Sequence, residues 1–217
     1  MRAYQTIFIE LALEYGVLRF GEFRLKSGRV SPYFFNLGAI STGVGLRRLA
    51  QAYAEAIEQT MPAFEVLFGP AYKGIPLAAA VVLQLAAHGR DLGFAYDRKE
   101  VKDHGEGGAL VGAPLRGRRV LLIDDVLTAG TALRASLQRL RDAGAEPVAA
   151  LVALDRQERG DGTASARAEL AGQTGLEIGA LVGVGDILEY LTANSGAVPA
   201  PALAAIRDYQ RRYGAGA

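Results

Sequence analysis

From about residue 64 onward, short apolar runs alternate with segments of helical periodicity, and this alternation limits the folds available to the chain. The runs are FEVLFG, LGFAY, RVLLIDD, PVAALVALD and LEIGALVGV, and the helical segments are IPLAAAVVLQLAAHG, about 131–143 and about 165–173. Near-continuous apolar stretches such as VLLI are typical of strands covered on both faces. The sequence therefore predicts an α/β fold, with a mostly parallel sheet flanked by helices.

The first 40 or so residues break this alternation. They contain a helical pattern near residues 2–15 and two strand-like stretches, VLRFGEFRL and SPYFFNLG, with a turn at Ser27-Gly28. A helix over about 46–61 follows, and the tail is helical in DILEYLTANS and PALAAIRDYQRRYG. We predict a single domain over residues 1–217, with about 1–40 forming a small N-terminal hood.

Composition limits the kinds of binding partner and metal site that we expect for this chain. A formal net charge of +1 gives no reason to expect nucleic acid or an anionic membrane, and the absence of cysteine excludes disulfides and thiolate metal sites. The longest apolar run is interrupted by Gln84 and is too short to cross a bilayer. Glu10 and Glu14 make the N-terminal pattern an amphipathic helix instead of a signal peptide. We expect a soluble, cytoplasmic protein.

The stretch VLLIDDVLTAGT, from Val120 to Thr131, places two adjacent carboxylates after an apolar strand and before a turn of small, hydroxyl-bearing residues. In a parallel sheet, ligands bind beyond the carboxyl ends of the strands. Free N–H groups at the start of the next helix suit a phosphate, whereas carboxylates accept hydrogen bonds from hydroxyls. A sugar phosphate would satisfy both. Side chains alternate along a strand, so Asp124 and Asp125 begin on opposite sides. From these two acids alone, a polar strand end followed by a helix cap is the favoured interpretation, whereas the whole stretch from Val120 to Thr131 is much more specific.

This stretch resembles the 5-phosphoribosyl 1-pyrophosphate (PRPP) signature of type I phosphoribosyltransferases. Four further segments, LKSGRVSPYFFNLG, GPAYKGIPLA, YDRKEVKDHGEGG and LDRQERG, resemble those of the orotate-using branch of that family, in the same order. The resemblance implies the type I phosphoribosyltransferase fold over the whole chain, with the hood over the base. It also implies transfer of the 5-phosphoribosyl group from PRPP to orotate, giving orotidine 5′-monophosphate and pyrophosphate in UMP synthesis.

The resemblance also implies roles for individual residues. Those facing PRPP would be Lys26, Tyr72, Lys73, Arg98, Lys99, Lys102, His104, Asp124, Asp125, Val126, Leu127, Thr128, Ala129, Gly130, Thr131 and Ala132. Orotate would contact Lys26, Phe34, Phe35, Thr128 and Arg156. Catalysis would depend on Lys73, Lys99, Lys102, His104 and Asp125. The family implies Mg²⁺ held mainly through PRPP and water, without a dedicated protein metal site. It further implies a homodimer in which the 98–108 loop of one subunit enters the site of the other.

The residues themselves leave several alternatives open. Acidic residues offset the basic ones in the 98–108 segment, so a solvated charged loop is also possible, although two of the four lysines of the chain lie there. Adjacent Phe34 and Phe35 point in opposite directions, which favours core packing of both rings. Arg156, without the resemblance, would be interpreted as a surface arginine.

Three other functions compete with the orotate assignment. A purine phosphoribosyltransferase would differ in the base it consumes. A regulator of the same fold would bind RNA or DNA without turnover and with strong salt dependence. An enzyme that makes PRPP would need an ATP site, and no segment of the sequence resembles one.

Overall fold

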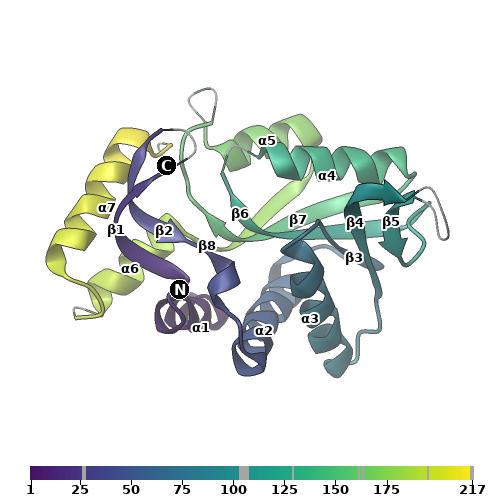
Figure 1. The fold of residues 1–217 in the computed structure, drawn as a ribbon, viewed down its shortest axis with the longest axis horizontal. Helices are drawn as coiled ribbons and strands as arrows, with labels where there is room; N and C mark the ends of the chain where they lie inside the picture. Colours follow the sequence, from purple (N-terminus) through teal and green to yellow (C-terminus); the bar gives the residue numbers. More distant parts are fainter. Residues whose placement is uncertain are drawn as a thin grey trace.

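The computed structural model describes residues 1–25, 28–102, 108–128, 130–160, 162, 164–194 and 196–215, with the backbone alone for residues 99–102 and 108. Helices and strands follow one another through the chain (Figure 1). They are α1 (Ala3–Glu14), β1 (Leu18–Arg24), β2 (Val30–Phe35), the short 3-10 helix η1 (Leu37–Ala39), α2 (Gly43–Thr60), β3 (Val66–Gly69), α3 (Gly74–Ala87), β4 (Gly93–Lys102), β5 (Gly108–Gly112), β6 (Arg119–Leu127), α4 (Thr131–Asp142), β7 (Glu146–Asp155), α5 (Ala166–Thr174), β8 (Glu177–Gly183), α6 (Val184–Ala193) and α7 (Ala200–Tyr213).

The predicted sheet is confirmed. It has the strand order β5-β4-β3-β6-β7-β8, and all neighbouring pairs are parallel except β4 with β5. The prediction of a loop beginning at Arg98 was wrong, because β4 continues to Lys102 and pairs with the unpredicted strand β5. Glycines at both ends of β5 concealed it, since glycine is depleted in strands.

Helices cover both faces of the sheet (Figure 1). Leu121 and Ile123 of β6 contribute to a core with α1, α2 and α3, whereas Val120 and Leu122 contribute to a second core with α4 and α5. Alternation along one strand thus supplies apolar side chains to two layers, which explains why the run reads as continuously apolar.

The N-terminal strands form a separate antiparallel pair, β1 with β2, and β2 packs against the C-terminal helix α7. In Figure 1 these two parts of the chain, at opposite ends of the colour bar, lie side by side. Buried Tyr33 of β2 meets Tyr209 of α7 edge-on, with ring centroids 6.2 Å apart. No helix in the described ranges is long and apolar enough to span a bilayer.

The order of the strands creates a switch point between β3 and β6. The chain moves from β3 to β4 on one side, and later returns to place β6 on the other side. Pairing of β3 with β6 ends at Phe68 and Leu122, whereas pairing of β6 with β7 continues to Leu127 and Asp155. The end of β6 therefore extends past β3, and crevices of this kind are where open α/β sheets bind ligands.

Candidate active site

Asp124 and Asp125 lie inside β6, which runs on to Leu127, so the strand does not stop at the acids as the sequence suggested. Each carboxylate accepts the next backbone N–H at 2.8 Å: Asp124 from Asp125, and Asp125 from Val126. Asp124 lines a pocket of about 210 Å³, and Asp125 reaches Lys73. The two acids thus have different surroundings, in line with the predicted alternation.

The pocket lies at the N-terminus of α4. Besides Asp124 its lining includes Val126, Leu127, Thr128, Gly130, Thr131 and Ala132. Gly130 precedes the helix with φ of 74°, a left-handed conformation that favours glycine. The first-turn N–H groups of a helix have no intrahelical acceptor, so the turn offers amides and hydroxyls to an anion.

Lys73 joins three segments of the site. Its ammonium lies 2.8 Å from the carboxylate of Asp125 and 3.4 Å from the amide oxygen of Asn36, which follows β2. The Lys73 side chain is 57% exposed, so it can turn toward an incoming anion without breaking a buried pair. Asn36 was not predicted as a site residue, although a polar residue directly after a strand of alternating burial is a usable signal.

The loop from Gly69 to Gly74 carries Tyr72 and Lys73 and closes very tightly. A Cβ on Gly69 would lie 2.0 Å from the carbonyl oxygen of Gly74, and one on Gly74 would lie 2.6 Å from Pro70. Both glycines are therefore required by close backbone approach. Tyr72, 62% exposed, stands at the tip of the loop.

Burial raises the pKa of Asp124 to about 6, and the neighbouring charge of Asp125 adds to this shift. The hydroxyl of buried Tyr53 donates to the backbone oxygen of Asp124 at 2.8 Å, which fixes this end of the strand. Because burial and a neighbouring charge disfavour its ionised form, this carboxylate would be stabilised by further hydrogen-bond donors. Ribose hydroxyls are suitable donors for it.

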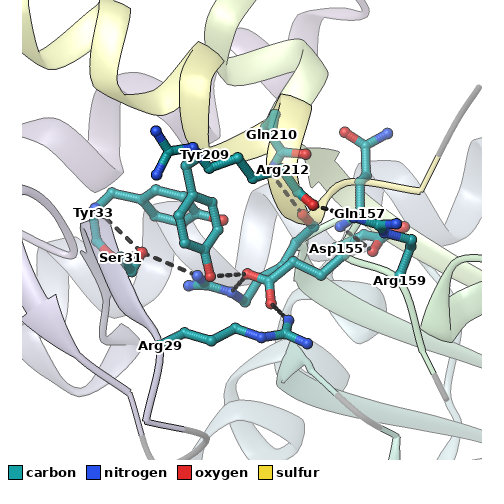
Figure 2. A network of polar contacts seen from close by, with 11 residues as sticks. Arg29, Ser31, Tyr33, Asp155, Gln157, Arg159, Tyr209, Gln210 and Arg212 are labelled. Carbon is teal, nitrogen blue, oxygen red and sulfur yellow. Dashed lines mark hydrogen bonds and ion pairs between the residues drawn. The ribbon is translucent and has the colours of Figure 1, made fainter.

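Arg156 follows β7, and pairing of Asp155 with Leu127 brings it beside the β6 turn. Its interpretation as a surface arginine was wrong, because Arg156 is 5% exposed. Its Nε donates to Glu158 at 2.7 Å, its Nη2 donates to Ser31 at 3.1 Å, and the guanidinium lies 4.4 Å from the centre of the Tyr33 ring. Figure 2 shows this buried network.

Glu158 is the centre of that network. Besides Arg156 it accepts from the Tyr209 hydroxyl at 3.1 Å and from Arg29 at 3.2 Å. Gln210 of α7 donates to the backbone oxygen of Arg156 at 3.1 Å. Glu158 and Tyr209 were not predicted from the sequence: Glu158 lies inside LDRQERG, whereas Tyr209 lies in a tail with no motif.

The two phenylalanines after Tyr33 lie in different surroundings, as their alternation predicted, but core packing of both rings was wrong, because of the two only Phe35 belongs to the buried core. Phe35 is buried against Phe8, with ring centroids 6.2 Å apart, and Phe34 stacks on Phe23 at 5.4 Å. Their rings are held by the protein itself, so a base at this edge would meet mainly the backbone of β2.

The remaining predicted residues are placed only in part. Arg98 lies in β4, and for Lys99 and Lys102 the structure gives the backbone. Lys26, His104 and Ala129 lie outside the described residues. The residues that the structure brings together along the carboxyl edge of the sheet are Tyr72, Lys73, Asp124, Asp125, Thr128, Gly130, Thr131, Ala132 and Arg156.

This fold and this edge define a class of protein. Residues 42–163 match the family model of the phosphoribosyl transferase domain. An orotate phosphoribosyltransferase of Thioalkalivibrio sulfidiphilus is 54% identical over 215 residues, covering 99% of this chain and 100% of the relative. The crystal structure of orotate phosphoribosyltransferase from Francisella tularensis aligns with a TM-score of 0.83 at 40% identity, covering 95% of each chain. UMP synthase of Leishmania donovani aligns with a TM-score of 0.80 at 27% identity, covering 96% of this chain and 42% of that one. The chain belongs to the orotate phosphoribosyltransferase family.

Proposed function

We propose that this protein transfers the 5-phosphoribosyl group of PRPP to orotate, releasing pyrophosphate and forming orotidine 5′-monophosphate for UMP synthesis. The observation that carries the proposal is the Lys73–Asp125 pair, which lies in the switch-point crevice beside the turn that opens α4. A cation for the leaving group, an acceptor for ribose and an amide turn for the 5′-phosphate thus lie at one edge.

The reaction is demanding because pyrophosphate leaves while positive charge develops on the ribose. Thr128, Gly130 and Thr131 bind the 5′-phosphate, and Asp124 and Asp125 accept from the ribose hydroxyls. Lys73 leaves Asp125 for the pyrophosphate and stabilises its growing charge. Positioning and charge stabilisation of this kind lower the barrier without a protein nucleophile.

Base recognition rests on Arg156. Orotate differs from uracil by one carboxylate, and a guanidinium binds a carboxylate through two parallel hydrogen bonds. Glu158 holds the Nε of Arg156, which orients the plane of the guanidinium. Lys26 and the backbone at Phe34 and Phe35 would complete the base site, and the hood of residues 1–40 would cover it.

Mg²⁺ fits the donors at this site as a substrate-bound ion. The oxygens of Asp124 and Asp125 suit it, but each acid already spends one oxygen on a backbone N–H. Within the described part of the chain, no three His, Cys, Asp or Glu side chains gather as a metal site. The ion would neutralise charge on pyrophosphate. Chelation should abolish turnover, and added Mg²⁺ should restore it.

We propose a homodimer that pairs through α3, with the 98–108 segment entering the partner's site. The outward positions of α3 are apolar: Pro76 and Ala86 are exposed, and Leu83 is 71% exposed. Such a face favours contact with a protein, and α3 begins directly after Lys73. Lys99, Lys102 and His104 would then act across the dimer. Mixing Lys102→Ala with Asp125→Asn subunits should recover activity. A mixture that stays inactive would contradict donation in trans.

We also place the enzyme in the cytoplasm, because highly charged PRPP does not cross membranes unaided.

The deciding experiment adds PRPP and Mg²⁺ to purified protein with orotate, uracil, adenine or hypoxanthine, and follows base absorbance. Of these bases, only orotate should be consumed, and the Lys73→Ala variant should consume orotate more slowly. Consumption of a purine, or salt-dependent RNA binding without turnover, would overturn the proposal.

A further inference from the structure

A third carboxylate, besides those of Asp124 and Asp125, lies behind the pyrophosphate side of the site. Asp97 of β4 is 2% exposed, which is unusual for an acid. It accepts the backbone N–H of Ala71 at 2.6 Å and forms an ion pair with Arg139 of α4. A buried charge is tolerated when it is paired and hydrogen-bonded in this way.

These contacts join three segments that approach the ligand separately. Ala71 belongs to the loop that carries Tyr72 and Lys73, Asp97 directly precedes Arg98, and Arg139 belongs to the helix whose first turn receives the phosphate. The Asp97 carboxylate fixes one backbone group of the loop and is itself neutralised from the opposite layer of the protein.

The negative charge of Asp97 would oppose binding of pyrophosphate unless it were neutralised. Pyrophosphate is a polyanion, and a bare buried carboxylate behind its loop would repel it through a medium of low dielectric constant. The charge of Asp97 already reaches the site, since it is one of the causes that raise the pKa of Asp124. Arg139, with its side chain 52% exposed, offsets that charge.

We propose that Asp97 and Arg139 are a pair of positioning residues that hold the Pro70–Lys73 loop for pyrophosphate, with Arg139 cancelling the charge of Asp97. This inference rests on the proposed function and adds residues that do not themselves touch the substrate. It predicts an effect on PRPP and pyrophosphate and none on the base.

The test is a double-mutant cycle with KM for PRPP, pyrophosphate and orotate measured for each variant. Arg139→Gln leaves the Asp97 charge unbalanced, so KM for PRPP and pyrophosphate should rise about ten-fold while KM for orotate and kcat stay nearly constant. Asp97→Asn keeps an acceptor for Ala71 and should change them less than about three-fold. The double variant should return to the Asp97→Asn values. If the pair served only to stabilise the fold, the two substitutions would instead have additive effects on the KM values for PRPP, pyrophosphate and orotate alike.

The matched control lies at the opposite end of the same strands. Glu65 accepts the backbone N–H of Arg119 at 3.0 Å and pairs with Arg118, so it repeats the hydrogen-bonding pattern of Asp97 at an exposed position, with its side chain 43% exposed. Arg118→Gln should leave every KM unchanged. Equal effects of Arg118→Gln and Arg139→Gln, or a double variant as poor as Arg139→Gln, would overturn the inference. If the wild type does not consume orotate, the proposed function fails first. If the wild type is active and Arg139→Gln has normal KM values, this inference alone fails.

Discussion

The two ends of the proposed site, one assigned to phosphate and the other to the base, are built in contrasting ways. At the phosphate end, main-chain groups of a short turn and a 57% exposed lysine face solvent, and a single ion pair ties Lys73 to Asp125. At the base end, the Arg156 side chain is 6% exposed and is held by Glu158, Ser31 and the ring of Tyr33. The phosphate end depends on the exposed ammonium of Lys73, and the base end depends on the buried guanidinium plane of Arg156.

The contrast follows from what each end must do. Phosphates are large, strongly hydrated anions that change during the reaction, so exposed cations can follow them at little cost. In the proposed function, a carboxylate on a flat base must be distinguished from its absence, and a buried, pre-oriented guanidinium would achieve this because an unpaired partner there is costly. Substitutions at the two ends should therefore separate effects on stability from effects on activity.

The largest expected effect is on catalysis at the phosphate end. Lys73→Ala should lower kcat about 10²- to 10³-fold, as expected when one donor to developing charge is lost. The melting temperature should stay the same, because the removed side chain is exposed. Steady-state kinetics with thermal unfolding checks both. A large drop in Tm would show that Lys73 is structural.

The base end should respond mainly in stability and orotate use. Arg156→Met removes one partner of a buried pair and should cost about 3 kcal/mol of unfolding free energy. The additional change Glu158→Leu should regain much of that stability without regaining orotate turnover. Denaturant titration of the two variants tests this, and restored turnover in the double variant would contradict the role of Arg156.

Asp124→Asn should make the fold more stable and impair the use of PRPP. Because folding raises the pKa of Asp124 to about 6, its ionisation destabilises the fold above that pH. The variant should gain about 1–2 kcal/mol above pH 6, and the gain should vanish as pH falls toward 4. In the wild type, kcat/KM for PRPP should fall below about pH 6, whereas this acidic limb should be absent in the variant. An unchanged limb would assign it to another group.

The smallest effect is expected at the rim of the buried network. Arg29 is about one-third exposed and lies 3.2 Å from Glu158, so Arg29→Ala should cost at most about 0.5 kcal/mol. KM for orotate should change less than two-fold, since Tyr209 still holds Glu158. A loss as large as that of Arg156→Met would mean that the network acts as one unit.

Sequence reasoning was strongest where periodicity and burial agree. The parallel strands around VLLI and VAALVAL were predictable because runs covered on both faces have few other structures available. Strand β5 was missed, since its glycines resemble a loop and its partner β4 carries the charged RKEVK stretch.

The site divides in the same way. Asp124, Thr128 and Gly130 could be proposed from local chemistry, because the acid already offers an acceptor to hydroxyls and the turn before a helix offers donors to a phosphate. Arg156 and Glu158 could not, since their burial depends on Tyr209, which lies 51 residues away from Glu158 in the sequence. Asp97 likewise could not be selected from the sequence, because its partner Arg139 lies 42 residues away.

The most direct test of the contrast compares the affinities of orotidine 5′-monophosphate and uridine 5′-monophosphate, which differ by one carboxylate. Their Kd values would be measured by calorimetry for the wild type, Lys73→Ala and Arg156→Met. We predict that the first two proteins share the same preference for orotidine 5′-monophosphate and that Arg156→Met binds both nucleotides equally. A preference that survives in Arg156→Met, or disappears in Lys73→Ala, would contradict the division of the site into a mobile phosphate end and a fixed base end.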